Sequence, residues 1–143
     1  MRTKFNNILM LIVAVLLGCK HPSDQAVTEA PPPGLYSYTG FDTQGKPVVV
    51  GTFSLAFGKD GAVSGEWVFE KSGSGEVGPQ VGTGRLEGRL EKNEIKINLN
   101  PGWADNNVFL DGKFEGGTIK GKWTWVTFRG PTTEGTFEAT PKQ

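Results

Sequence analysis

From residue 35 onward, apolar and polar side chains alternate in short runs, and glycine-containing turns separate the runs about every ten residues. Successive side chains of a β-strand point to opposite faces of a sheet, so alternation gives each run one buried and one exposed face. No run keeps a helical period. The pattern predicts an all-β domain of eight antiparallel strands, at 35–41, 47–57, 62–70, 81–90, 94–99, 107–115, 118–128 and 133–139.

Three tight turns test the predicted faces, because a slip of one residue would turn a whole apolar face outward. Gly116-Gly117 suits a two-residue type I′ turn. Residues 59–61 (Lys-Asp-Gly) suit a three-residue loop with a left-handed glycine, and residues 92–93 (Lys-Asn) suit another two-residue turn. The inward pairs that these turns predict are Phe57 with Val63, Leu90 with Ile95, and Phe114 with Ile119. The first strand stays ambiguous, because Tyr36 and Tyr38 compete with Leu35 and Phe41 for its inner face.

The eight strands are predicted to run as an up-and-down meander. An inward glycine precedes a large apolar residue by two positions in several strands, as in Gly51-Thr52-Phe53 and Gly121-Lys122-Trp123, which lets a strand coil sharply. Closure of the meander into a barrel removes exposed edges and is favoured over the alternative, a β-sandwich. The tight turns then share one end. The connections after the first, third, fifth and seventh strands are expected to be longer and to share the other end, with a mobile loop at 71–80.

The first nineteen residues read as a secretory signal. Met1 to Lys4 carries positive charge, Ile8 to Leu17 is unbroken apolar sequence, and the run is shorter than the ~20 residues of a membrane-spanning helix. The ending, 16–19 (Leu-Leu-Gly-Cys), resembles the lipobox of bacterial lipoproteins, although a smaller residue than Leu17 is usual. The resemblance implies cleavage before Cys19 and acylation of that cysteine. The alternative is an ordinary cleaved signal that leaves a free thiol.

The resemblance also predicts where the protein resides. Lys20, the residue after the cysteine, resembles the pattern of lipoproteins that are sorted to the outer membrane. The expected location is therefore the bacterial cell envelope, where lipid on Cys19 would bind the protein to the membrane. Residues 20–34 are polar and proline-rich and lack apolar periodicity, which is typical of a tether. The predicted organisation is therefore a signal peptide at 1–18, the lipidated cysteine and tether at 19–34, and a single barrel domain at 35–143.

Charge and residue types exclude several functions. The chain has 15 basic and 15 acidic residues, and removal of the signal with Arg2 and Lys4 leaves 13 minus 15, or −2, without a basic block for nucleic acid. The only histidine, His21, lies in the tether, and the domain has no cysteine, so neither a metal site nor an activated nucleophile is expected. The cluster 105–107 (Asp-Asn-Asn) fits a turn better than a calcium loop. The following glutamates are expected on outward faces: Glu66, Glu70, Glu87, Glu115, Glu134 and Glu138.

Binding is the remaining prediction, at the end with the longer loops. The candidate ligand-binding residues are Trp67, Phe69, Trp103, Trp125 and Arg129. The alternative is that the inward aromatic side chains only pack the hydrophobic core and bind no ligand. Trp103, in a Gly/Pro/Asn loop, could cover the barrel mouth as a lid or act as a recognition contact.

The architecture resembles calycins, the group of small barrels that includes lipocalins and avidins, in strand count, meander order and loop asymmetry. Their sequence signatures are missing: there is no lipocalin-type Gly-x-Trp in the first strand and no avidin-type polar lining. The predicted inward faces carry no charge, which disfavours a polar ligand and permits an apolar one. Together with the missing catalytic and metal-binding residues, this predicts a non-catalytic, cofactor-free binding module that takes an apolar small ligand or a protein partner at the long-loop end. The alternative is a structural lipoprotein with a filled barrel, which would bind another envelope component through an outer patch of Phe109, Val126 and Phe128.

Overall fold

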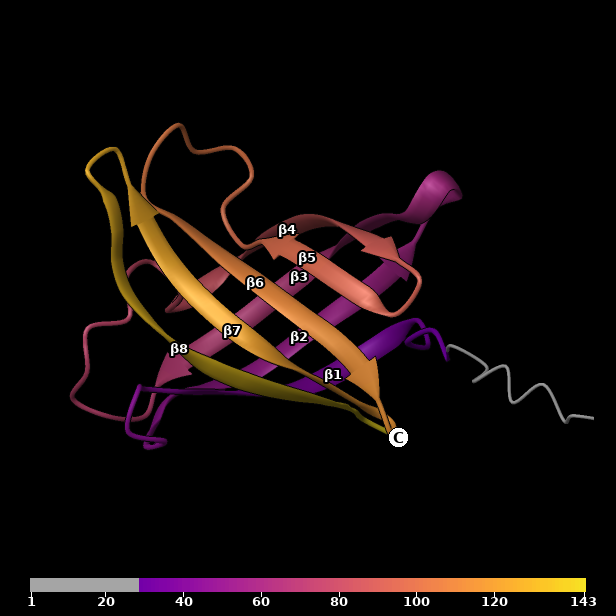
Figure 1. Cartoon of the computed structure of the whole chain (residues 1–143), viewed down its shortest axis with the longest axis horizontal. Coiled ribbons are helices and arrows are strands. Elements are labelled where there is room, and N and C mark those ends of the chain that lie inside the picture. Colours follow the sequence, from indigo (N-terminus) through magenta and orange to yellow (C-terminus); the bar gives the residue numbers. More distant parts are fainter. Residues whose placement is uncertain (1–28) are drawn as a thin grey trace, which may run out of the picture.

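The computed structural model describes residues 29–143 and contains the eight expected strands. They follow one another around the barrel in chain order (Figure 1). Their bounds are β1 Gly34–Phe41, β2 Pro47–Phe57, β3 Ala62–Lys71, β4 Gly82–Glu91, β5 Glu94–Asn98, β6 Asn107–Glu115, β7 Thr118–Thr127 and β8 Gly130–Pro141. The predicted signal peptide, Cys19 and the tether up to residue 28 lie outside the described residues. Within residues 29–143, no helix has the length and apolar character needed to cross a bilayer.

The meander closes on itself, which confirms the barrel and excludes the sandwich. β1 pairs antiparallel with β2 on one side and with β8 on the other, from Tyr36 opposite Pro141 to Phe41 opposite Thr136. Every strand therefore has two hydrogen-bonded neighbours along at least part of its length. Closure satisfies backbone groups that an open sheet would leave at its edges.

The register agrees with the turn analysis. Phe57 lies opposite Val63, Leu90 opposite Ile95 and Phe114 opposite Ile119. Gly116 and Gly117 both have positive φ, as a type I′ turn requires. The ambiguity of β1 is also resolved, because Tyr36 and Tyr38 are buried whereas Leu35 is exposed.

Aromatic side chains fill the interior of the barrel. The Tyr38 ring stacks on Phe69 with a centroid distance of 4.3 Å, and Tyr36 stacks on Phe53 at 5.5 Å. Inward glycines make room for these rings: a Cβ at Gly84 would lie 2.7 Å from the indole of Trp67. The buried side chains form one cluster that runs the length of the barrel: Tyr36, Tyr38, Val48, Val49, Phe53, Leu55, Val63, Trp67, Phe69, Val77, Leu86, Ile95, Ile97, Leu99, Val108, Leu110, Phe114, Ile119, Trp123, Phe137 and Ala139.

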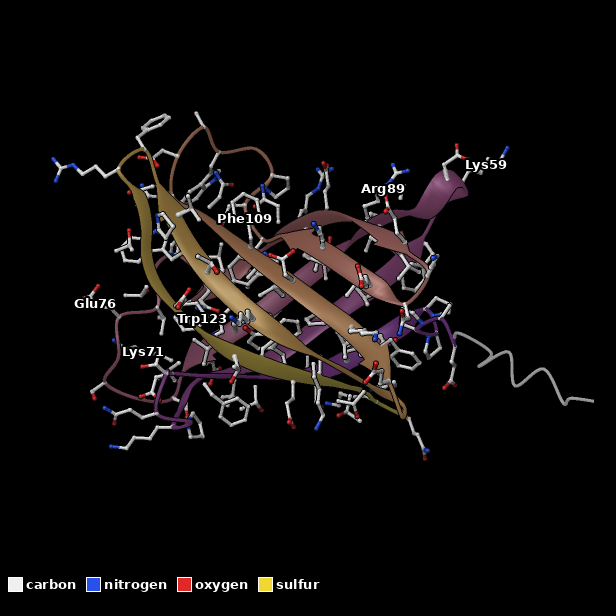
Figure 2. All side chains as sticks on the ribbon, in the orientation of Figure 1. Lys59, Lys71, Glu76, Arg89, Phe109 and Trp123 are labelled. Atoms are coloured by element: carbon white, nitrogen blue, oxygen red, sulfur yellow. The ribbon has the colours of Figure 1, made fainter. Side chains whose placement is uncertain are left out.

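The two ends of the barrel differ as expected, with one correction. The turns after β2, β4 and β6 gather at one end, and the loops after β1, β3 and β5 gather at the other (Figure 1). Figure 2 shows Lys59 and Arg89 at the tight-turn end and Lys71 and Glu76 at the long-loop end. The connection between β7 and β8, however, is a tight turn of two residues, Phe128 and Arg129, rather than a longer loop.

The early start of β8 explains this correction. The sequence predicts that this strand begins at 133, because Pro131 and the following threonines lack apolar alternation. β1 pairs with β8 only from Thr136 onward, so Gly130–Gly135 bond to β7 alone among the described strands. A proline is tolerated in such a half-paired segment, since its missing N–H need not face a neighbour. The hydroxyl of Thr127 accepts the N–H of Arg129 and stabilises the turn.

The described N-terminal residues lie at the tight-turn end and form part of its packing. Pro31 is buried, and the Tyr36 hydroxyl donates a 2.5 Å hydrogen bond to the carbonyl of Pro32. At the other terminus, the N–H of Lys142 donates to the carbonyl of Leu35. The last residues of the predicted tether are therefore in contact with the base of the barrel.

Candidate functional site

Trp67 and Phe69, two of the residues predicted to bind a ligand, lie within the packed interior. Both are almost completely buried, and the Trp67 Nε1–H donates a 2.8 Å hydrogen bond to the carbonyl of Leu99. Phe69 lies between the ring of Tyr38 and the indole of Trp67. Neither side chain reaches the surface at the mouth of the barrel.

The loop between β3 and β4 covers that mouth. We call residues 72–81 the strap. Two of its side chains, Val77 and Gln80, are buried, and Gly78 lies so close to the indole of Trp125 that a Cβ there would be 2.5 Å from it. The hydroxyl of Thr133 donates to the carbonyl of Glu76 at 3.2 Å. The sequence predicts a mobile loop at 71–80, whereas in the structure this loop packs over the mouth.

Gln80 is the unusual residue of the strap. Its Oε1 accepts a long hydrogen bond of 3.3 Å from the Tyr38 hydroxyl, and its Nε2 has no partner among the described residues. A buried polar group without a partner costs roughly 1–3 kcal/mol. Burial also raises the pKa of Tyr38 far above its usual value, so the phenol stays neutral and can donate.

Trp103 and Trp125 come together at the rim. They line a cleft of about 580 Å³ between the strap, the β5–β6 loop and β7. Arg129 is exposed at the tip of the β7–β8 turn and does not line this cleft. The complete lining is Lys71, Glu76, Val77, Gly78, Pro79, Val81, Trp103, Asn106 and Trp125. Of the five predicted residues, the structure therefore brings Trp103 and Trp125 together in this cleft, whereas Trp67 and Phe69 contact each other in the interior.

Trp103 is the most accessible of these aromatic side chains, with 56% of its surface exposed. It does not fold over the mouth, which the strap occupies. It also lines a second cleft of about 370 Å³, together with Arg85 and Glu87 of β4. Solvent therefore reaches the indole from two directions.

A network of side-chain hydrogen bonds holds the loop that carries Trp103. The buried Asn100 accepts the N–H of Val108 through Oδ1, and its carbonyl accepts the N–H of Trp103 at 3.0 Å. Asn107 Nδ2 donates to the carbonyl of Trp103, and the Trp125 Nε1–H donates to Asn106 Oδ1. The indole therefore projects from a braced loop.

Asp105 connects this loop to its neighbour. Its Oδ1 accepts the backbone N–H of Asn106 at 2.7 Å and that of Phe128 at 2.8 Å. The second bond fixes the β7–β8 turn, whose Phe128 side chain is 82% exposed, beside the β5–β6 loop. The sequence indicates turn chemistry at 105–107 but predicts neither this link nor the role of Asn100. Repeated Asn and Asp in one short loop were the available signal.

The described residues show no cluster suited to acid–base or metal chemistry. The six glutamates predicted to face outward are all exposed, including Glu66 and Glu134. Within residues 29–143, acidic side chains do not gather in groups of three or more that could hold a metal ion. Ion pairs such as Lys113–Glu115 (2.7 Å) and Lys120–Glu138 (3.0 Å) are exposed and contribute little to stability.

Comparison with known proteins gives a structural likeness but no sequence relative. No protein-family model matches the sequence, and no curated protein matches it. The crystal structure of rhizavidin is similar over 76% of this chain and 84% of that chain, with 17% sequence identity and a TM-score of 0.46. A likeness of this size carries no information about function.

Proposed function

We propose that this chain is the non-catalytic binding module of a lipid-anchored bacterial envelope protein, and that a protein partner docks on its long-loop rim around Trp103. The observation that supports this most is the exposed indole on a braced loop. Tryptophan and arginine are the residue types that most often dominate protein–protein binding energy. A braced anchor loses little conformational freedom on binding, so less of its contact energy is lost.

The surroundings of Trp103 also suit a protein partner. Phe128 is 82% exposed on the turn that Asp105 ties to the same loop, and Arg129 is exposed beside it. Large aromatic side chains that remain this accessible are enriched where proteins associate. Lys71 and Glu76 add charges of both signs along the cleft, as in the polar rim of a typical interface.

The proposed anchor lies on the opposite side from the rim. The described chain begins at the tight-turn end, and the lipobox resemblance puts acyl chains on Cys19. Pro31 is twelve residues further along, which allows a reach of at most about 40 Å. Several acyl chains would hold the base firmly at a membrane, and Lys20 suggests the outer membrane. The rim would then face away from the lipid.

A small ligand inside the closed barrel receives no support, because side chains occupy the interior. This packing instead favours the alternative of a filled barrel that meets another envelope component through its outer wall. The surface for that second candidate is Phe109, Val126 and Phe128. Phe109 is 38% exposed on the outer face of β6 (Figure 2), whereas Val126 is half-buried. The rim and the wall are distinguishable positions.

Site-specific photo-crosslinking in intact cells tests the proposal. A photoreactive amino acid replaces Trp103, Phe109 or Asn93, the last at the tight-turn end. We expect one defined adduct from position 103, which Asp105→Ala weakens by loosening the loop and Phe128→Ala weakens by removing a neighbouring contact. An adduct from position 109 alone would favour the outer wall. Adducts from position 93 alone, or of equal yield from all three, would contradict a rim site.

A further inference from the structure

The first half of β4 has a neighbouring strand on one side only. β3 pairs with residues 82–89 of β4, whereas β5 pairs only with residues 87–91. β5 stops there because its chain turns away from β4: Asn98 Oδ1 accepts the N–H of Asn100 at 2.9 Å. The 370 Å³ cleft that Arg85 and Trp103 line lies along this half-paired segment, residues 82–86.

Two residues of this segment direct their backbone groups into the cleft. In a hairpin with a two-residue turn, the flanking residues, here Glu91 and Glu94, form a hydrogen-bonded pair. Alternate residues of a strand bond to the same side, and β4 has no bulge, so Thr83 and Arg85 face the same side as Glu91. Within the described residues, no hydrogen bond joins the β5–β6 loop to Thr83 or Arg85.

A second half-paired segment, at the start of β8, is protected against an added strand, whereas the segment in β4 is not. In β8, Pro131 lacks an N–H, and the strap covers Thr133 through the carbonyl of Glu76. Residues 82–86 (Gly-Thr-Gly-Arg-Leu) contain no proline, and Thr83 and Arg85 are exposed. An exposed edge with free backbone groups is a template to which another chain can add as a strand.

The outer wall beside this edge favours particular side chains on an added strand. Thr52, Val68 and Thr83 lie opposite one another on β2, β3 and β4, and this row of β-branched side chains ends at the free edge. Arg85 lies opposite Glu66, but its guanidinium forms no ion pair among the described residues. An acidic side chain next to Arg85 and a β-branched one next to Thr83 would therefore be stabilising.

The inner side of the same edge is filled. Gly84 packs against the indole of Trp67, where an added Cβ would lie 2.7 Å away. The Trp67 Nε1–H reaches across the edge to the carbonyl of Leu99 at 2.8 Å. A residue added opposite Gly84 would face this indole, so only a small side chain fits there.

We propose that the protein partner adds an extended segment to β4 as an antiparallel strand, paired with the backbone of Thr83 and Arg85. This inference rests on the proposed function, because the added strand would lie beside Trp103, and it names the element that the partner supplies. The segment carries an acidic residue opposite Arg85, a small residue next, and a β-branched residue opposite Thr83. A basic residue opposite Arg85 is disfavoured by like charge, which makes the edge selective.

Two synthetic peptides test the charge preference: acetyl-Glu-Ala-Thr-Val-Thr-amide and its counterpart with Lys in place of Glu. Titration of the ¹⁵N-labelled full chain, followed by NMR, should shift the amides of Thr83 and Arg85 and leave those of Gly116 and Gly117 unchanged. We expect the Glu peptide to bind about fivefold more tightly, the effect of one cross-strand charge pair. Arg85→Glu should reverse this preference. Equal binding of the two peptides, or no shift at Thr83 with millimolar Glu peptide, would overturn the proposal.

N-methylation of the Glu peptide tests the backbone pairing itself. A methyl group on the nitrogen of its first Thr, the residue expected opposite Thr83, removes an N–H that faces β4 and should weaken binding about tenfold. A methyl group on the nitrogen of the following Val, whose N–H faces away from β4, should leave binding almost unchanged. Equal effects of the two methyl groups would mean that the peptide does not pair as a strand, and would overturn the proposal.

A variant of the chain distinguishes failure of this inference from failure of the rim proposal. Thr83→Pro removes the N–H that faces the cleft, and Thr83→Val, which keeps it, is the matched control; the amides of Gly116 and Gly117 report whether each variant is folded. In intact cells, Thr83→Pro should reduce the photo-crosslinked adduct from position 103, whereas Thr83→Val should not. An undiminished adduct with Thr83→Pro would overturn the added strand and leave the rim proposal intact. Peptide pairing at β4 without an adduct from position 103 would contradict the rim proposal alone.

Discussion

The two ends of this barrel solve the problem of connecting strands in different ways. At the tight-turn end, backbone geometry alone connects the strands, because the turns are short and Gly116 and Gly117 take positive φ. At the long-loop end, side chains hold the connections in place. Asn100 and Asp105 accept hydrogen bonds from backbone N–H groups, and Gln80 extends into the mouth of the barrel. The second end exposes the large aromatic side chains of Trp103 and Phe128, whereas the first exposes the smaller aliphatic side chain of Leu35.

With the proposed function, this difference separates the residues that stabilise the fold from those that would bind a partner. We expect the aromatic core and the tight turns to supply most of the stability, with little from the exposed side chains of Trp103 and Phe128. The rim can therefore retain accessible aromatic side chains, an arrangement that is expected of surfaces selected for binding rather than for stability. Four measurements, in decreasing order of the change they should detect, can test this division.

Two phenylalanines give the largest contrast. Phe114 is buried near the tight-turn end, and Phe128 is 82% exposed at the rim. Phe114→Ala should lower the free energy of unfolding by about 3–4 kcal/mol, because it leaves a cavity. Phe128→Ala should change it by less than about 0.5 kcal/mol. Urea unfolding followed by circular dichroism measures both. Similar losses for the two variants would break the division between the ends.

Alkaline pH should destabilise the fold through its buried tyrosines. Burial raises the pKa of Tyr36 from 10.0 to about 12 and that of Tyr38 still further. Below pH 10 both states hold the phenol proton, so stability is constant. Above pH 10 only the unfolded state releases it, and stability falls by up to about 1.4 kcal/mol per pH unit for each tyrosine.

Urea midpoints between pH 8 and 11.5 measure this dependence. Tyr36→Phe removes one of the two contributions and should make the decline shallower. A decline that begins below pH 9, or one that Tyr36→Phe leaves unaltered, would contradict the burial of these phenols.

Gln80 and Tyr38 should be coupled in stability. Tyr38→Phe leaves Gln80 Oε1 buried without its donor and should cost about 1–2 kcal/mol. Gln80→Leu leaves the Tyr38 hydroxyl without its acceptor but also removes the unpaired Nε2, so its cost should be smaller. The double variant removes both polar groups and should be close to neutral. A double-mutant cycle from urea unfolding measures the coupling. Simple additivity of the two single losses would show that the strap does not pair these side chains.

Two glycines provide the smallest contrast. Gly117 has φ of +79° in the β6–β7 turn, whereas Gly102 in the rim loop has no positive φ, and a Cβ added there would meet no heavy atom within 4 Å. Gly117→Ala should cost about 1 kcal/mol, because a side chain is strained at positive φ. Gly102→Ala should have almost no effect. Thermal unfolding of both variants measures the difference, and equal shifts would contradict the assigned turn geometry.

Local patterns predicted the fold because the turns and the apolar faces agree. The pairing of Phe114 with Ile119 follows from the glycine turn between them, and closure follows from the cost of open edges. Two features of the fold could not be predicted from the sequence. Pro131 concealed the start of β8, since its tolerance depends on where β1 stops pairing. The first strand gave no decision between Tyr36 and Leu35, because both are apolar enough to be buried.

The candidate site was harder to predict, because its contacts join distant segments. The sequence indicates aromatic residues near the mouth but does not separate Trp67, whose indole bonds to Leu99, from Trp103, which is exposed. Nor does it indicate that Gln80 reaches Tyr38, 42 positions earlier in the chain. A glycine-rich loop is predicted to be mobile when only its sequence is considered, because its long-range contacts are not visible there.

Hydrogen exchange at the four indole N–H groups tests the central claim most directly, namely a dry packed barrel with its accessible aromatic surface at the rim. Trp67 donates a buried 2.8 Å hydrogen bond to the carbonyl of Leu99, and Trp123 donates a partly buried one of 2.8 Å to the carbonyl of Phe41. Trp125 donates a longer, exposed bond of 3.3 Å. After transfer to D₂O, the NMR signals of Trp103 and Trp125 should disappear within minutes, and those of Trp67 and Trp123 should persist for hours. Loss of the Trp67 signal as fast as that of Trp103 would mean an open, hydrated interior and would contradict the account.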